Sequence, residues 1–210
     1  MLDAASYLKD AEVTFSLLPT IHRKNFRDIK SFLELAQEIG VPIAFSLLTC
    51  NSYETKLRDY VLTEQEFRDF INQNRGNEDF HINESPINID DIVFKTTCGA
   101  GKSTISIDAE GNVYPCHMLH SKELCMGNIL IDKWNTIFDG KKGHDLIDFD
   151  VDIIDECFKC EYKYFCGGGC KARTLYAKKT LNAPDIYCMG LKDIYKDLAD
   201  FFAELAENID

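Results

Sequence analysis

The chain has 210 residues, a net charge of −12, and 45% hydrophobic against 28% charged residues, as expected for a soluble globular protein. The acidic balance argues against nucleic acid as a partner, because phosphate backbones need a basic surface. No apolar run approaches membrane-spanning length, and the first residues, MLDAASYLKD, lack the basic and apolar regions of a secretory signal. We therefore expect no nucleic acid and no membrane among the partners, and the density of cysteines favours a reducing cytoplasm.

A strand–helix–strand unit is predicted near the start of the chain. Val13–Leu18 and Ile43–Leu48 are short apolar runs rich in strand formers. Between them, Asn25 is a candidate N-cap, and hydrophobic residues then recur at helical spacing until Gly40 and Pro42 end the helix. Such a βαβ unit is the repeat of parallel α/β folds.

The middle of the chain predicts another helix and then a bridge between two regions. Thr63 and Glu66 have the spacing of a capping box at a helix start. Asn72–Asp90 is polar and rich in turn-forming residues, so we interpret it as irregular. This places one region at residues 1–90 and a second at residues 91–210.

The second region is predicted to contain a hairpin and two helices. Thr104–Ile107 and Asn112–Tyr114 are the expected strands, with Gly111 supplying a positive φ at their turn. Trp134–Gly140 predicts a short helix and turn, and Asp185–Asn208 predicts a closing amphipathic helix.

The cysteines form the most informative pattern in the sequence. Seven of the nine follow the order Cys98-x12-Gly111-x4-Cys116, Cys157-x2-Cys160-x5-Cys166-x3-Cys170, Cys188. Thiolate sulfur binds soft metals and iron–sulfur clusters, and four such ligands complete one site. Seven are too many for one cluster and nearly enough for two, so we interpret the pattern as a two-cluster iron–sulfur module.

Two other uses of these cysteines are weaker. A disulfide scaffold suits short secreted chains, and an odd number of cysteines does not fit one. A structural zinc site is the stronger rival, because Cys157-x2-Cys160 has the spacing of a zinc knuckle. Zinc would need four cysteines and leave three without a role, so the spacing favours iron–sulfur and leaves zinc open.

The pattern resembles the SPASM domain, the auxiliary-cluster domain at the C-terminus of many radical S-adenosylmethionine peptide-modifying enzymes. The sequence between the cysteines is similar too: IDAEGNVYPCHML around Cys116, MGNI at Met126–Ile129, and CGGGCKAR at Cys166–Arg173. The resemblance is strong from about Cys98 to Cys188 and weak before it. It implies an α/β fold: residues 1–90 as a remnant of the last strands and helices of a partial (β/α) barrel, then a small cysteine-rich α+β iron–sulfur domain in residues 91–210.

The resemblance also implies a ligand set for two [4Fe-4S] clusters. The first cluster would be held by Cys98, Cys116 and Cys170. The second would be held by Cys157, Cys160, Cys166 and Cys188.

This assignment leaves the first cluster one ligand short. Cys125 is a candidate for the fourth position; the alternatives are that Cys125 is a buried free thiol and that the open iron binds a thiolate of the substrate peptide. His117 stands where sulfatase-maturing relatives carry an aspartate that acts as a base, and this departure favours peptide cross-linking. His117 is a weak catalytic candidate, and we favour a hydrogen-bonding role near the cluster. Cys50 is expected in the core or along a substrate channel.

The motif that cleaves S-adenosylmethionine in such enzymes, Cys-x3-Cys-x2-Cys, is missing, because Cys50 alone precedes Cys98. The resemblance therefore implies the C-terminal part of an enzyme that modifies a ribosomally made peptide, with thioether cross-linking as the favoured reaction. S-adenosylmethionine would bind only with the missing part, which a complementary barrel subunit could supply. The alternative is a non-catalytic iron–sulfur protein for electron transfer or peptide presentation, so whether the chain is an enzyme stays open.

Overall fold

The computed structural model describes residues 2–50, 55–77, 80–82, 94–139 and 149–207. The chain forms two compact units, one from Met1–Leu48 and Leu57–Ile92, the other from Thr49–Lys56 and Val93–Asp210. Within the described ranges, no helix is both long enough and apolar enough to cross a membrane.

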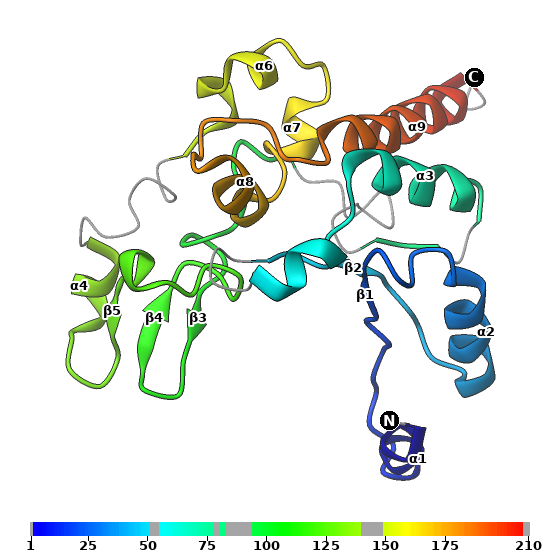
Figure 1. The fold of residues 1–210 in the computed structure, drawn as a ribbon, viewed down its shortest axis with the longest axis horizontal. Coiled ribbons are helices and arrows are strands. Elements are labelled where there is room, and N and C mark those ends of the chain that lie inside the picture. Colours follow the sequence, from blue (N-terminus) through cyan, green and yellow to red (C-terminus); the bar gives the residue numbers. More distant parts are fainter. Residues whose placement is uncertain (1, 51–54, 78–79, 83–93, 140–148, 208–210) are drawn as a thin grey trace. The chain divides into compact units, whose positions relative to one another are not determined.

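The first unit is built around a parallel pair of strands (Figure 1). Its elements are α1 (Leu2–Asp10), β1 (Thr20–Ile21), α2 (Ile29–Ile39), β2 (Ser46–Leu47), most of the 3-10 turn η1 (Thr55–Tyr60), and α3 (Glu64–Asn74). Because α2 connects β1 to β2 and the two strands are parallel, the predicted βαβ unit is present.

The first strand lies later in the chain than predicted. Thr20 pairs with Ser46, and Leu17 makes an isolated bridge to Ile43 in the same register. Pro19 separates the two pairings: it accepts a hydrogen bond from the Ser46 amide at 3.1 Å but has no N–H to donate. The expected strand at Val13–Leu18 is therefore wrong except at Leu17.

The helix between the strands also begins later than predicted. Asn25 is not its N-cap, because its side-chain oxygen accepts the His22 amide at 2.8 Å within a turn. The helix begins at Ile29 and ends at Gly40, whose φ of 73° lies in the left-handed region. The predicted end of this helix is thus confirmed and its start is corrected.

The capping box of α3 is confirmed: the Thr63 hydroxyl accepts the Glu66 amide, and the Glu66 carboxylate accepts the Thr63 amide. The buried face of this helix is formed by Phe67, Phe70 and Ile71. Within the segment predicted to be irregular, Ile82 bridges to Phe45 and so extends the pairing beyond β2. Residues 78–79 and 83–93 of that region lie outside the described part of the chain.

The second unit holds a small antiparallel sheet followed by short helices. Its elements are β3 (Ser106–Ile107), β4 (Asn112–Tyr114), η3 (Lys122–Leu124), β5 (Gly127–Asn128), α4 (Trp134–Asp139), η4 (Val151–Ile153), α6 (Asp155–Phe158), α7 (Lys163–Cys166), α8 (Lys171–Lys178) and α9 (Cys188–Glu207). The predicted hairpin is β3–β4, and the two predicted helices are α4 and α9.

Gly111 closes the hairpin as expected, with φ at +84°. A Cβ there would also lie 2.8 Å from Leu130 Cγ, so both backbone and space require glycine. The third strand, β5, pairs with β4 and was not predicted, because a two-residue strand within MGNI carries no periodic signal. Val113, Met126 and Ile137 form the small core of this sheet.

Candidate metal centre

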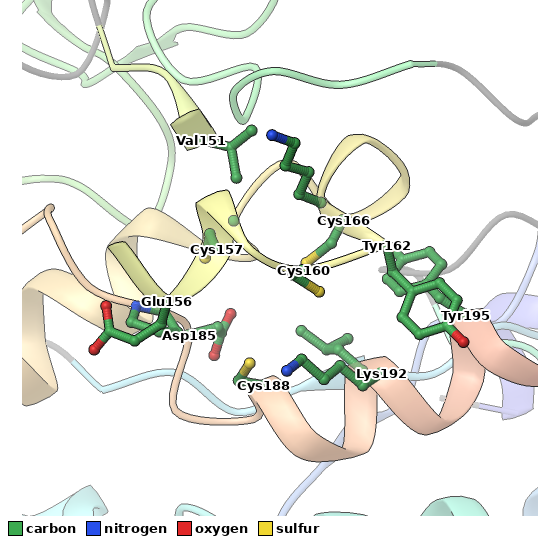
Figure 2. Close-up of a pocket in the computed structure, with 14 residues that line it drawn as sticks. Val151, Glu156, Cys157, Cys160, Tyr162, Cys166, Asp185, Cys188, Lys192 and Tyr195 are labelled. Atoms are coloured by element: carbon green, nitrogen blue, oxygen red, sulfur yellow. The ribbon is translucent and has the colours of Figure 1, made fainter. Parts of the chain in front are cut away.

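Four cysteine side chains line one pocket in the second unit. They come from α6, the turn after it, the end of α7 and the start of α9: Cys157, Cys160, Cys166 and Cys188. In Figure 2, Cys188 and Lys192 on α9 point toward the side of the pocket where Cys160 and Cys166 lie. These four are the ligands that the resemblance assigns to the second cluster; below they are called the second cysteine group.

Local structure brings this group together. The Cys160 amide donates to the Cys157 carbonyl at 2.9 Å, which folds the Cys-x2-Cys segment into a tight turn. Cys166 is the last residue of α7, and Gly167 follows in a left-handed conformation that ends the helix there. Cys188 is the first residue of α9, so its side chain extends from a helix terminus.

Three other cysteines lie against a different core. Ala100, Leu119 and Ala172 form this core, and Cys98, Cys116 and Cys170 pack against it, together with neighbouring apolar side chains. The Gly101 amide donates to the Pro115 carbonyl at 2.8 Å, and the Tyr176 hydroxyl donates to the Met118 carbonyl at 2.7 Å. These bonds join the loops that carry Cys98 and Cys116 to α8, which follows Cys170. We call Cys98, Cys116 and Cys170 the first cysteine group.

The backbone curls at the glycine run between Cys166 and Cys170, where all three φ angles are positive, at 61°, 80° and 72°. A Cβ on Gly169 would lie 2.5 Å from the Asp185 Cβ, which no side chain tolerates. The Gly168 amide donates to the Cys166 thiol. The amides of Gly167 and Gly169 instead bind the carbonyls of Lys163 and Cys166.

A buried ion pair that sequence reasoning missed connects the two cysteine groups. Arg173 and Asp185 have side chains only 2% and 1% exposed, and the guanidinium is 2.8 Å from the carboxylate. The Asp185 carboxylate also accepts the Cys170 amide at 2.6 Å, and its backbone carbonyl accepts the Cys188 amide at 3.2 Å. Asp185 thus fixes one cysteine from each group, and no pattern in the sequence pairs it with Arg173.

The thiols are held in surroundings that disfavour the free thiolate. Burial raises the pKa of Cys166 to about 12 and that of Cys170 to about 11. It also raises the pKa values of Cys116 and Cys157. A metal ligand must be a thiolate, so a positively charged metal centre is what would compensate for this burial.

Of the remaining predicted site residues, His117 lies beside the first cysteine group. Cys125 donates to the Gly127 carbonyl at 3.5 Å and is not among the residues packed against the first group's core. His117 Nδ1 is 3.6 Å from Cys116 Sγ, so its ring is beside the first group as expected. Cys50 is half-buried, three residues beyond β2.

The donor chemistry of the two groups fits an iron–sulfur cluster. All seven donors are thiols, and no disulfide joins any of the nine cysteines. Within the described ranges, no three His, Cys, Asp or Glu side chains are arranged to hold a single metal ion. A cluster distributes its thiolates over several irons and therefore needs ligands farther apart than one ion does.

Residues 98–161 match the family model of SPASM, described as an iron–sulfur cluster-binding domain. The chain contains a SPASM domain. The matched residues include the first four cysteines of the pattern, and Cys166, Cys170 and Cys188 follow beyond the match. Iron–sulfur clusters are accordingly the cofactors that this domain implies.

The similarity extends past the SPASM domain. A cysteine-type anaerobic sulfatase-maturating enzyme of Clostridium perfringens is 24% identical over 226 residues, 98% of this chain and 60% of that protein. The Bacillus subtilis protein AlbA of antilisterial bacteriocin subtilosin biosynthesis is 36% identical over 85 residues, 39% of this chain and 18% of that protein. The solved structure of native anSMEcpe with bound AdoMet and the Kp18Cys peptide has a TM-score of 0.72 and 19% identity, covering 98% of this chain and 61% of that one. The chain thus spans about 60% of the length of the first of these relatives.

Proposed function

We propose that this chain is the auxiliary-cluster portion of a radical S-adenosylmethionine enzyme that modifies a ribosomally made peptide. The observation that carries the proposal is the division of seven thiols into two groups, four around one pocket and three against one core. The names of the relatives, a sulfatase-maturating enzyme and a bacteriocin biosynthesis protein, support a peptide or protein substrate. Reduced thiols at this density further support a cytoplasmic location.

Each group would hold one [4Fe-4S] cluster. The second group supplies four thiolates for a complete set: Cys157, Cys160, Cys166 and Cys188. The first group supplies three, from Cys98, Cys116 and Cys170, and leaves one iron for a further ligand. Cys125 or a cysteine of the peptide would take that position.

The open position supports thioether formation as the reaction. In this reaction a peptide C–H loses its hydrogen atom to the 5′-deoxyadenosyl radical, which the missing part of the enzyme would generate. A deprotonated peptide thiol then forms the C–S bond, and one electron is left over. When bound, the clusters supply a ligand position for the thiolate and an acceptor for that electron. The chain's own residues hold the thiols in place, and His117 is positioned to bond near the first group.

The βαβ unit favours a part of an enzyme over a free-standing electron carrier. β1 and β2 form a two-stranded parallel sheet, and parallel strands occur almost entirely within larger α/β sheets and barrels. A small carrier of electrons has no use for such strands, whereas an enzyme whose barrel continues beyond this chain does. We therefore rank the non-catalytic alternative second.

Anaerobic reconstitution with iron and sulfide tests the proposal. Two four-iron clusters predict about eight iron and eight sulfide per chain. About one zinc without sulfide would identify a structural zinc fold and remove the proposal. If the clusters form, the chain is mixed with a barrel polypeptide carrying Cys-x3-Cys-x2-Cys, S-adenosylmethionine, a reductant and a cysteine-containing peptide. Mass spectrometry should then find the peptide lighter by two hydrogen atoms; an unmodified peptide in the presence of 5′-deoxyadenosine would argue against thioether chemistry.

A further inference from the structure

Lys171, the first residue of α8, is a cation in the interior of the second unit. It is only 1% exposed, although lysine is rarely buried without a charged partner. Within the described ranges, its ammonium has one long hydrogen bond, to the Ala183 carbonyl at 3.5 Å. It also lies over the Phe149 ring, 4.0 Å from the centroid. An ammonium has three donors, so these contacts do not use its full capacity.

The surrounding backbone makes room for this ammonium. Gly168 has a φ of +80°, and a Cβ there would lie 3.0 Å from Lys171 Nζ and 3.4 Å from its Cε. The ring beneath the ammonium, Phe149, packs in the same core as Cys157, with Val151 and Ile154. The cation is therefore held beside the second cysteine group while its backbone adjoins Cys170 of the first.

Acidic side chains from both cysteine groups act on the ammonium of Lys171. Burial lowers the pKa of Lys171, and four acidic groups raise it: Cys98, Cys157, Asp185 and Cys166. The Asp185 carboxylate already binds the Arg173 guanidinium through two nitrogens, so its charge is largely offset. The other three acidic groups are cysteines, one of the first group and two of the second; Lys192 is a further cation that acts on Cys157.

We propose that Lys171 is the shared counter-cation of the two cysteine groups and raises the reduction potentials of the clusters that they hold. The proposal rests on the proposed function, because it needs clusters at these cysteines. A reduced cluster carries one more negative charge than an oxidised one. A fixed cation stabilises the reduced form more, and the effect is strong where water is excluded. Lys171 is thus a positioning and electrostatic residue rather than a catalytic one.

Replacement of the charge tests this role. The chain is reconstituted as wild type, Lys171→Met and Lys171→Arg, iron and sulfide are counted, and each cluster is titrated with reductant while its EPR signal is followed. Lys171→Met keeps an unbranched side chain and removes the charge, so both potentials should fall. We expect the reduction equilibrium to shift about tenfold, which is about 59 mV for one electron. Lys171→Arg retains the charge and should stay near the wild-type potentials.

Lys196→Gln is the matched control, because Lys196 is exposed on α9 and its loss removes the same formal charge. Solvent screens that charge, so the potentials should not move. Potentials in Lys171→Met equal to those in Lys196→Gln would overturn the proposal.

Two further outcomes are decisive. If Lys171→Met fails to take up clusters while Lys171→Arg loads fully, the charge is required for assembly and the proposal stands. If both variants fail alike, the side chain's shape matters rather than its charge, and the proposal is wrong. A wild-type chain that takes up no iron and sulfide would instead refute the proposed function itself, so the two failures are distinguishable.

Discussion

At the scale of single residues, burial keeps the thiols of Cys166 and Cys170 protonated to a higher pH than in the unfolded chain. The pKa of Cys166 is raised by burial to about 12 and that of Cys170 to about 11, from an ordinary value of 9.0. Between these values the unfolded chain releases the protons and the folded chain keeps them. The free energy of unfolding of the metal-free chain should therefore fall as the pH rises above 9.0. We expect a loss of up to ~1.4 kcal/mol per pH unit for each thiol.

Urea unfolding of the metal-free chain at mildly and strongly alkaline pH measures this loss. The double variant Cys166→Ala, Cys170→Ala is the control, because it removes both buried thiols and should lose most of the pH dependence. An equally steep dependence in the double variant would assign the effect to other groups.

The buried pair of Arg173 and Asp185 gives the second prediction. Asp185→Asn keeps an acceptor for the Cys170 amide but removes the carboxylate charge that pairs with the buried guanidinium of Arg173. Breaking a buried pair in this way costs about 3–5 kcal/mol. We expect the cluster-loaded chain to unfold at much lower denaturant concentration under anaerobic conditions, and to lose iron as it does.

Asp152→Asn is the comparison for that experiment. The pair of Asp152 and Lys163 lies in the same unit at 2.6 Å, but its side chains are 38% and 16% exposed. Removing this carboxylate should cost much less stability, because solvent screens the pair. Equal losses of stability in the two variants would mean that burial does not strengthen the contribution of the Arg173–Asp185 pair.

At the scale of secondary structure, the two cysteine groups are built on different elements. The first uses the end of the hairpin and the start of α8, whereas the second uses α6, α7 and α9. We therefore predict that Cys116→Ala and Cys188→Ala each lose about four of eight iron and keep different EPR signals. Cys50→Ala should keep all of its iron, because Cys50 belongs to neither group. Identical residual signals in the first two variants would refute the division of ligands.

The sequence predicted those elements that have local signals. The capping box of Thr63 and Glu66, the turn at Gly111 and the helix end at Gly40 each depend on a few adjacent residues. The start of β1 was misplaced, because the apolar run before Pro19 has the composition of a strand, whereas the residues that pair with β2 come after Pro19. β5 was missed because it owes its conformation to β4.

The candidate site likewise combines features that the sequence predicted with features that depend on tertiary contacts. The identities of the seven cysteines were evident from spacing, and their allocation to two clusters came from the resemblance. The structure places four of them around one pocket and packs the other three against one core. Asp185, Arg173 and Lys171 were not singled out, because only tertiary contacts make an ordinary charged residue into a buried one.

At the scale of the whole molecule, the first unit exposes apolar surface beside its short sheet. β1 pairs with β2, and among the described residues no other strand adjoins β1. A pocket next to it is lined mainly by apolar side chains, including Leu17, Leu18, Phe32 and Ile43. Exposed strand edges of this kind favour pairing with another chain. In the longer enzyme that we propose, a preceding strand would cover this edge.

We therefore expect the isolated chain to self-associate through this edge. Leu18 is 55% exposed, and Leu18→Lys would place a charge at the edge and so oppose strand pairing. Anaerobic sedimentation velocity should show the cluster-loaded wild type as a concentration-dependent mixture and Leu18→Lys mainly as monomer. Leu130→Lys is the matched control, because Leu130 is 74% exposed and belongs to the second unit rather than to the unit that contains β1. Removing this apolar side chain should leave association unchanged if the edge is responsible. A wild-type chain that stays monomeric at every concentration would show that the edge needs no cover, and would weaken the case that a barrel continues beyond β1.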